Sequence, residues 1–194
     1  MSTHIHARPD FDAIIDLVAP GTRVLDLGCG DGQLMAQLVE RKRVSARGVE
    51  IDEAEVRACV ARGLSVRQGN IEEGLADFPD GVFDYVILSE TIAFLNRPAP
   101  VVREMLRVGR SAIISFRNAG YWRVRWAMVT GRGFGAPLIA GQPRERAITL
   151  SAFEEFCGSL GARVQQRVFI TGTRRIRLLP SLLAEIAVYV LARS

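Results

Sequence analysis

The chain has 194 residues, of which 48% are hydrophobic and 24% charged, a length that fits one domain with a sizeable core. This composition excludes a disordered, collagen-like or disulfide-framework protein. The three cysteines form no CxxC pair, and no apolar run reaches the ~20 residues of a membrane helix. We therefore expect a cytoplasmic protein with free thiols, without a metal site and without a membrane anchor.

Charge is unevenly distributed along the chain. The net charge is +4, but residues 1–97 hold 10 basic and 16 acidic residues, whereas residues 98–194 hold 15 arginines and 5 glutamates. An anionic partner for the second half is one interpretation. Solvated helix and loop faces are the other, which we favour because the only tight basic run is 174–177.

Strand-like and helix-like segments alternate along the chain, which predicts a parallel sheet covered by helices on both faces. Apolar residues at 11, 14, 15 and 18 predict a leading helix. The predicted strands are 23–27, 46–50, 65–68, 84–89, 112–116, 164–170 and 185–191. The predicted helices between them cover about 33–41, 53–62, a short turn after residue 70, 101–108, 121–130 and 151–160. Apolarity alone also permits a helix at 185–191.

The fold class that follows is α/β: a doubly wound, mostly parallel, seven-stranded sheet in three layers. We expect a single domain over residues 1–194, with a variable insert at about 117–150. Three of the predicted helices begin with a capping residue that is followed three positions later by glutamate. These capping residues are Asp52, Asn70 and Ser151.

A glycine-rich turn follows the first predicted strand, in the run Val24-Leu-Asp-Leu-Gly-Cys-Gly-Asp-Gly32. Glycines have no Cβ to hold a ligand away from the backbone. The amides of the next helix point into the crevice at the strand ends, where open α/β sheets bind ligands. The candidate binding residues of this turn are Asp26, Gly28, Cys29, Gly30 and Gly32.

Glu50 lies 22 residues after Gly28, at the end of the second predicted strand. A carboxylate there can accept the hydroxyl hydrogens of a ribose. The glycine spacing is GxGxG and not the GxGxxG of dinucleotide folds. The Asp26 carboxylate would repel a phosphate and attract a cation. These features predict a nucleoside ligand that carries positive charge.

The glycine run, Glu50 and the apolar strand ending at Ser89 together resemble the class I S-adenosylmethionine-dependent methyltransferases. That resemblance implies S-adenosylmethionine or S-adenosylhomocysteine as cofactor. It implies that the glycine turn contacts the methionine and ribose parts, that Glu50 binds the ribose and that Ile51 lies against the adenine. Asn70 stands where the adenine amino group is bound, usually by aspartate, and Ser89 completes the set. We expect Cys29 to be a small packing residue.

Longer segments are similar to the MetW family of methionine biosynthesis proteins. They include the stretch from Arg8 to Leu34, GVEID, GLADFPDGVFDYVILSETI and EMLRVGRSAIISFRNAGYWRVR, in order through about residue 132. The resemblance implies a partner, the homoserine O-acyltransferase that feeds methionine synthesis. The sequence departs from the family pattern at Glu90, where glutamine is usual, and at 139–148, where an aromatic and histidine-containing segment is replaced.

Catalysis is the least determined property of the chain. Its two histidines, His4 and His6, lie near the N-terminus, and no triad or metal cluster is recognisable. The candidate catalytic residues are Glu90, Asn118 and Tyr121, which follow the fourth and fifth predicted strands. Three functions stay open: a cofactor-binding accessory of the acyltransferase, a methyltransferase acting on a small molecule, and, with less support, an RNA methylase. A nucleic-acid partner has no motif in its favour.

Overall fold

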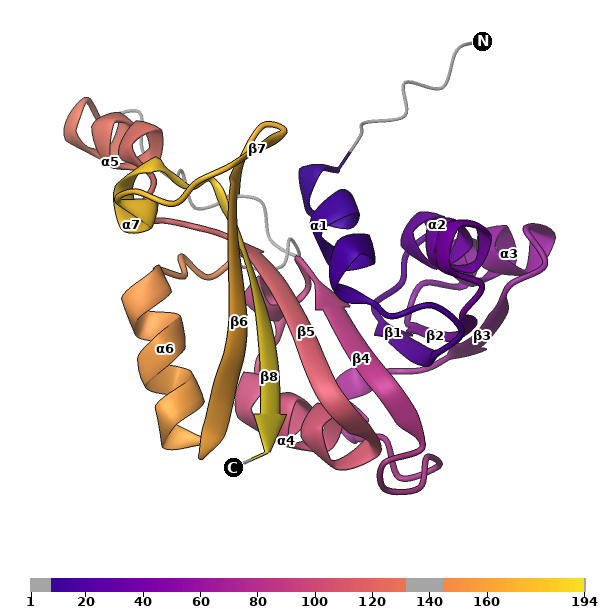
Figure 1. Ribbon diagram of the computed structural model, residues 1–194. Coiled ribbons are helices and arrows are strands. Elements are labelled where there is room, and N and C mark those ends of the chain that lie inside the picture. Colours follow the sequence, from indigo (N-terminus) through magenta and orange to yellow (C-terminus); the bar gives the residue numbers. More distant parts are fainter. Residues whose placement is uncertain (1–7, 132–144, 194) are drawn as a thin grey trace, which may run out of the picture.

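The computed structural model describes residues 8–131 and 145–193, which form one eight-stranded sheet with helices on both faces (Figure 1). The strands are β1 (Arg23–Leu27), β2 (Ser45–Glu50), β3 (Ser65–Gln68), β4 (Phe83–Ser89), β5 (Gly109–Arg117), β6 (Ala162–Thr171), β7 (Arg174–Arg175) and β8 (Ile186–Arg193). The helices are α1 (Pro9–Leu17), α2 (Gln33–Lys42), α3 (Glu53–Ala61), η1 (Ile71–Glu73), η2 (Ile92–Phe94), α4 (Pro98–Val108), α5 (Trp122–Val129), α6 (Leu150–Ser159) and α7 (Pro180–Leu183).

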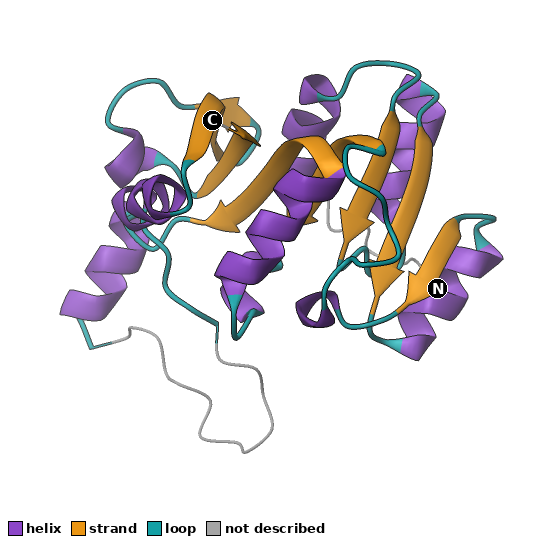
Figure 2. Ribbon diagram, turned by 90° about the horizontal axis from the view of Figure 1, so that it is seen from below, coloured by secondary structure: helices purple, strands orange, loops and turns teal. Residues whose placement is uncertain are grey.

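The strand order is β3-β2-β1-β4-β5-β8-β6-β7. Strands β1 to β5 pair in parallel, and β8 pairs antiparallel with both β5 and β6. The mostly parallel, doubly wound sheet is confirmed, with helices above and below it (Figure 2). The predicted count of seven strands is one too low, because the two-residue β7 extends the edge beside β6.

The order in which the strands are added reverses between β1 and β4. Because β1, β2, β4 and β5 are parallel, their carboxyl ends gather at one edge of the sheet. Alternate residues of β4 enter different cores. Val86 and Leu88 pack with α4 and α6, and Ile87 packs with α1 and α2. Both faces are therefore covered, and the strand ends provide the open crevice.

β8 is a strand and not the helix that its apolarity also permits. Its residues 186–192 are all buried, because it lies between two strand partners and under helices on both faces. Strands in that position are apolar throughout and show no period-two alternation. Tyr189 stacks against Phe116 there, with ring centroids 5.9 Å apart.

Helix caps differ in detail from the expectations. Asp52 caps α3, accepting from the amides of residues 54 and 55. The backbone amide of Asp52 donates to the carboxylate of Glu50. In a capping box it would donate to the glutamate three positions later, so the expected box is only half formed. α6 begins after Thr149, whose Oγ1 accepts from the amide of residue 152, and the prediction of Ser151 as its cap is wrong.

Parts of two expectations lie outside the described residues. These are His4 and His6, and positions 132–144 of the expected insert, which include most of segment 139–148. At the end of that segment, Arg146 is described, and its amide donates to the carbonyl of Ala93 at 2.9 Å. In the described part of the chain, no helix is both long and apolar enough to cross a bilayer.

Candidate functional site

The glycine turn between β1 and α2 holds three glycines with positive φ, at +69° for Gly28, +53° for Gly30 and +80° for Gly32. Two of them are required by packing. A Cβ on Gly28 would lie 2.9 Å from Oγ1 of Thr91, and one on Gly32 would lie 2.5 Å from Leu64. A Cβ on Gly30 would meet nothing within 4 Å. Gly30 is therefore the position of the turn with open space beside it.

Glu50 ties the end of β2 to this turn. Its Oε2 accepts from the Gly30 amide at 2.8 Å, and its Oε1 accepts from the amides of Ile51 and Asp52 at 2.8 and 3.0 Å. A carboxylate has about four acceptor positions. The three bonds leave one position, so the turn is held in place while Glu50 keeps capacity for one more donor.

A crevice of about 260 Å³ opens at the ends of β1 and β2. Its lining combines the glycine turn, the residues after β2 and β3, and η2; the residues are Gly28, Val49, Glu50, Ile51, Gly69, Asn70, Ile71, Glu72, Thr91, Phe94 and Leu95. Ile51 is exposed toward solvent, and Asn70 uses Oδ1 to cap η1 through the amide of Glu72 at 3.0 Å. The structure thus brings four predicted binding residues together: Gly28, Glu50, Ile51 and Asn70.

Asp26 lies behind the turn, almost fully buried at 2% exposure. Within the described residues its Oδ1 has no hydrogen-bond partner. Burial raises the pKa of this carboxyl to about 7; the nearby Arg8 lowers it, and the carboxylates of Asp10 and Glu50 raise it further. A buried, unpaired acceptor surrounded by other carboxylates favours a cationic ligand group.

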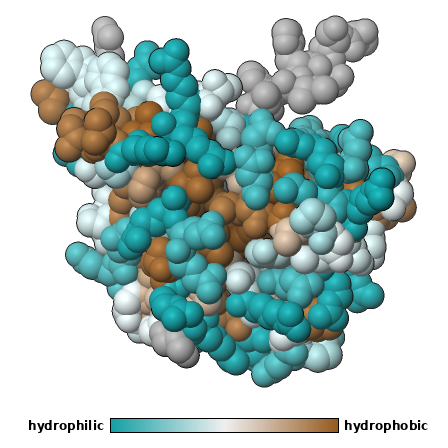
Figure 3. All heavy atoms as spheres, in the orientation of Figure 1, coloured by the Kyte–Doolittle hydropathy of each residue, from teal (hydrophilic) through white to brown (hydrophobic). Residues whose placement is uncertain are grey.

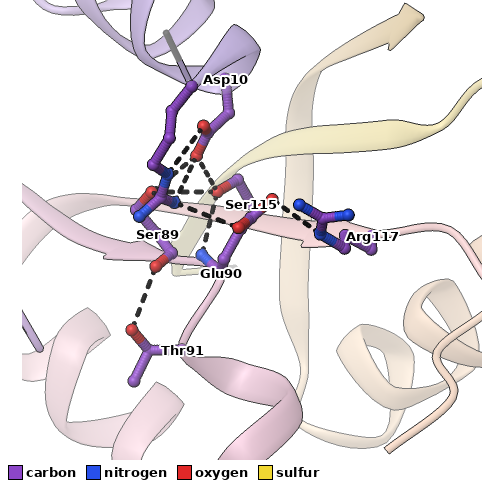
Figure 4. Close-up of polar contacts among 7 residues, drawn as sticks. Asp10, Ser89, Glu90, Thr91, Ser115 and Arg117 are labelled. Carbon is purple, nitrogen blue, oxygen red and sulfur yellow. Dashed lines mark hydrogen bonds and ion pairs between the residues drawn. The ribbon is translucent and has the colours of Figure 1, made fainter. Parts of the chain in front are cut away.

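A second polar cluster lies at the ends of β4 and β5, where α1 meets the sheet (Figure 4). Asp10, fully buried at the start of α1, accepts from Ser89 Oγ at 2.6 Å and from Ser115 Oγ at 2.8 Å. Arg8 donates to Ser89 Oγ at 2.7 Å and pairs with Asp10 at 3.0 Å. Ser89, a predicted cofactor residue, is therefore part of this cluster and does not line the 260 Å³ crevice.

Sequence reasoning missed Arg8, Asp10 and Ser115. One signal was present: Asp10 stands four positions before Ile14, on the apolar face of the predicted leading helix. A carboxylate on a buried helix face needs partners. The sequence did not show that these partners lie 79 and 105 residues further along the chain.

Glu90 connects the cluster to the region beyond β5. It has φ of +54°, a conformation uncommon for a non-glycine residue, and its carboxylate lies 3.6 Å from Arg8 and 3.5 Å from Arg117. Burial raises the pKa of Glu90; the carboxylates of Asp10 and Glu145 raise it further, and Arg8 and Arg117 lower it. Backbone strain of this kind concentrates at functional sites.

Comparison with known proteins decides the family. The family model described as "Methionine biosynthesis protein MetW" matches residues 8–191. The chain belongs to the MetW family. It is 36% identical over 177 residues to the "Bifunctional methionine biosynthesis protein MetXA/MetW" of Rhodopirellula baltica, a match that covers 82% of this chain and 28% of that protein.

The MetW chain is also similar to methyltransferases outside its family. It is 38% identical over 99 residues to a ubiquinone biosynthesis O-methyltransferase of Hahella chejuensis, covering 47% of this chain and 40% of that protein. The chain thus spans less than half the length of these curated relatives. An S-adenosylmethionine-dependent methyltransferase structure from Mesorhizobium loti superposes with a TM-score of 0.71 at 14% identity, covering 96% of this chain and 99% of that one. This likeness establishes the methyltransferase-type fold.

Tyr121 lines a pocket of about 400 Å³ between the end of β5 and α5. The lining also includes Arg117, Asn118, Ala119, Arg123, Val124, Ala127, Glu145, Arg146, Ala147 and Glu185. The Asn118 side chain is hydrogen-bonded to backbone atoms. Its Nδ2 donates to the carbonyls of Ser181 and Ala184 at 3.2 and 2.9 Å, and its Oδ1 accepts from the Gly120 backbone amide. This geometry favours a positioning role for Asn118 over the predicted catalytic one.

Cys29 contributes only its backbone to the turn. Its Sγ lies 4.0 Å from Sγ of Cys59, which in turn donates to the carbonyl of Gly30 at 3.1 Å. Burial raises the pKa of both thiols, so neither is a ready nucleophile at neutral pH. Among the residues that the structure describes, no group of three or more His, Cys, Asp or Glu side chains is placed to hold a metal ion.

Proposed function

We propose that this MetW chain binds S-adenosylmethionine or S-adenosylhomocysteine at the ends of β1 and β2, and acts with a homoserine O-acyltransferase in methionine biosynthesis. The observation that carries the first half is the Glu50–Gly30 hydrogen bond at the rim of the 260 Å³ crevice. It places a carboxylate with one remaining acceptor position beside a backbone without side chains, as recognition of a ribose requires.

The residues present fit the cofactor at both of its ends. The crevice at Glu50, Ile51 and Asn70 offers a carboxylate, an apolar face and an amide for an adenosine. Behind the turn lies the buried carboxyl of Asp26, whose Oδ1 has no hydrogen-bond partner among the described residues and which favours a positively charged group nearby. When bound, S-adenosylmethionine supplies a methyl group on a positively charged sulfur. The buried carboxylates of Asp10 and Asp26 favour that charge electrostatically.

The second half of the proposal concerns the partner. The name of the Rhodopirellula relative joins MetXA and MetW in one bifunctional protein, and this chain matches 28% of its length. Two activities that occur in one polypeptide are held at high effective concentration. Contact between a separate MetW chain and an acyltransferase would serve the same end.

The test is to mix the purified chain with a purified homoserine O-acyltransferase and to measure acyl transfer, with and without S-adenosylhomocysteine. We expect the rate to rise with chain concentration and to saturate in the micromolar range. An unchanged rate at every concentration contradicts the partner half of the proposal.

A second candidate function is methyl transfer to a small molecule, favoured by the pocket of about 400 Å³. This pocket shares Arg117 with the Glu90 ion pair, so it adjoins the polar cluster. Methyl transfer requires alignment of acceptor and methyl group, and a base only where the acceptor arrives protonated. Glu90, with its raised pKa, is the candidate base. The check is formation of S-adenosylhomocysteine from S-adenosylmethionine with a metabolite pool, and its loss in Glu90→Gln.

A further inference from the structure

Helix α5 is poorly supported by the rest of the protein. None of its eight residues is buried, and Trp122, Trp126 and Val129 follow one another at i, i+4 and i+7 on one face. Trp126 is 66% and Val129 81% exposed. An isolated helix of this length is unstable in water. A helix that presents two tryptophans to solvent is typical of a surface that is covered in an assembly.

A second apolar segment lies beside it. The Asn118 side chain, which precedes α5, is bonded to the carbonyl of Ser181 in α7, and a Cβ on Gly120 would lie 2.8 Å from that oxygen and 3.3 Å from Arg125 of α5. The exposed leucines of this segment are Leu178, Leu179, Leu182 and Leu183. α5 and α7 occupy the same end of the molecule (Figure 1), and hydrophobic side chains gather there (Figure 3).

We propose that this surface, made of Trp122, Trp126, Val129 and the four exposed leucines and here named the α5–α7 patch, is where the homoserine O-acyltransferase docks. The inference rests on the proposed function, which supplies the partner, and adds the place of contact. Aromatic residues carry a large part of the binding energy at protein interfaces. Both tryptophans of the chain lie in the patch.

The positive charge around the patch predicts the charge of the partner's docking surface. Residues 119–131 and 171–184 contain five arginines and no acidic residue. Of these arginines, Arg175 pairs with Asp16 at 2.8 Å, and Arg123 lies over the Trp122 ring. The partner's docking surface should therefore have an apolar centre and an acidic rim. Leucines and a valine, which cannot stack on bases, make up most of the patch and favour a protein over an RNA.

The two tryptophans allow a direct test. The full chain is labelled with 5-fluorotryptophan, so that both ¹⁹F resonances report on α5. Unlabelled, purified homoserine O-acyltransferase is then titrated in. We expect both resonances to shift or broaden saturably, at the concentrations that activate the acyltransferase.

Matched variants locate the contact while keeping both labels. Val129→Asp with Leu182→Asp places two charges in the patch, and we expect the Kd to rise more than about ten-fold. Val60→Asp is the control, because Val60 is 61% exposed on α3, near the opposite edge of the sheet. Its Kd should change less than about two-fold. Val60 and Val129 are largely exposed and Leu182 is partly exposed, so we expect all the variants to fold, and thermal melts check this.

The outcomes separate the inference from the proposed function. If the acyltransferase binds and is activated, but the double variant binds equally well, the docking site is wrong and the proposed partnership stands. If the wild type neither binds nor activates it, both fail. Resonances that move with chain concentration alone, or with RNA and not with the acyltransferase, show that a second copy or a nucleic acid covers the patch, and either result overturns the inference.

Discussion

Asp26 shows how one carboxylate acquires its properties from several parts of the chain. Its place in the glycine run predicts a role in ligand binding, and this role stays a prediction, because the structure places Asp26 behind the turn and outside the crevice lining. Its pKa of about 7 could not be predicted from the sequence, since burial is the main cause and Arg8, Asp10 and Glu50 contribute from three other segments. The same residue therefore links folding, ligand charge and pH.

The raised pKa of Asp26 predicts a pH-dependent stability. Between its ordinary pKa of 3.8 and about 7, the unfolded state has released the proton and the folded state retains it. Stability therefore falls as pH rises through this window. Relative to Asp26→Asn, the wild type should lose free energy of unfolding between pH 4 and 7 and show no further relative change above pH 7. Urea denaturation of both proteins checks this, and parallel pH profiles would show that Asp26 titrates normally.

Gly30 tests whether the open position of the turn serves a ligand. Gly30→Ala adds a Cβ into empty space at φ +53°, and Gly63→Ala does the same at φ +74° at a position that does not line the crevice. Each should cost about 1–2 kcal/mol of stability, because L-residues disfavour positive φ. Only Gly30→Ala should also weaken S-adenosylhomocysteine binding, measured by calorimetry. Equal affinity in both variants removes Gly30 from the cofactor site.

Among the elements, α1 is the one whose function the sequence showed least. Its apolar spacing predicted the helix correctly, and its buried face packs with α2 and with Ile87 of β4. Its first turn, however, closes the ends of β4 and β5 through Asp10, and these contacts join residues that are far apart in the chain. Local patterns specify elements; they do not specify which polar groups meet when elements pack.

Removal of the Asp10 carboxylate should destabilise the fold at this junction. Asp10→Ala leaves two buried serine hydroxyls and Arg8 without their common acceptor, so we expect a loss of about 2–4 kcal/mol in denaturant unfolding. Asp12→Ala in the same helix removes an exposed ion pair with Arg41 and serves as the control. It should cost far less. Similar losses in the two variants would mean that the buried cluster contributes little.

At the scale of the whole molecule, the doubly wound, mostly parallel sheet and the crevice at its strand ends were predicted from the alternation of elements and the glycine turn. The 400 Å³ pocket and the short α7 were not, because they are assembled from irregular segments around β5 without a periodic pattern. The structure also shows where part of the positive charge of the second half lies. Five of its arginines belong to residues 119–131 and 171–184, the segments that carry the α5–α7 patch.

This positive charge predicts that association with the acyltransferase depends on salt. Arginines around the patch should steer an acidic surface toward it, and that attraction is screened within about 8 Å at physiological ionic strength. The association rate, measured by stopped flow, should fall several-fold between about 50 and 300 mM salt, with a smaller change in the dissociation rate. A rate independent of salt argues against an acidic partner surface.

The central claim, cofactor binding at the ends of β1 and β2, is tested most directly by calorimetric titration of the chain with S-adenosylhomocysteine and, separately, with NADH. We predict saturable one-to-one binding of S-adenosylhomocysteine, its loss in Glu50→Ala with the fold retained by circular dichroism, and no binding of NADH. Binding of NADH in its place, or an affinity for S-adenosylhomocysteine unchanged by Glu50→Ala, would contradict the account.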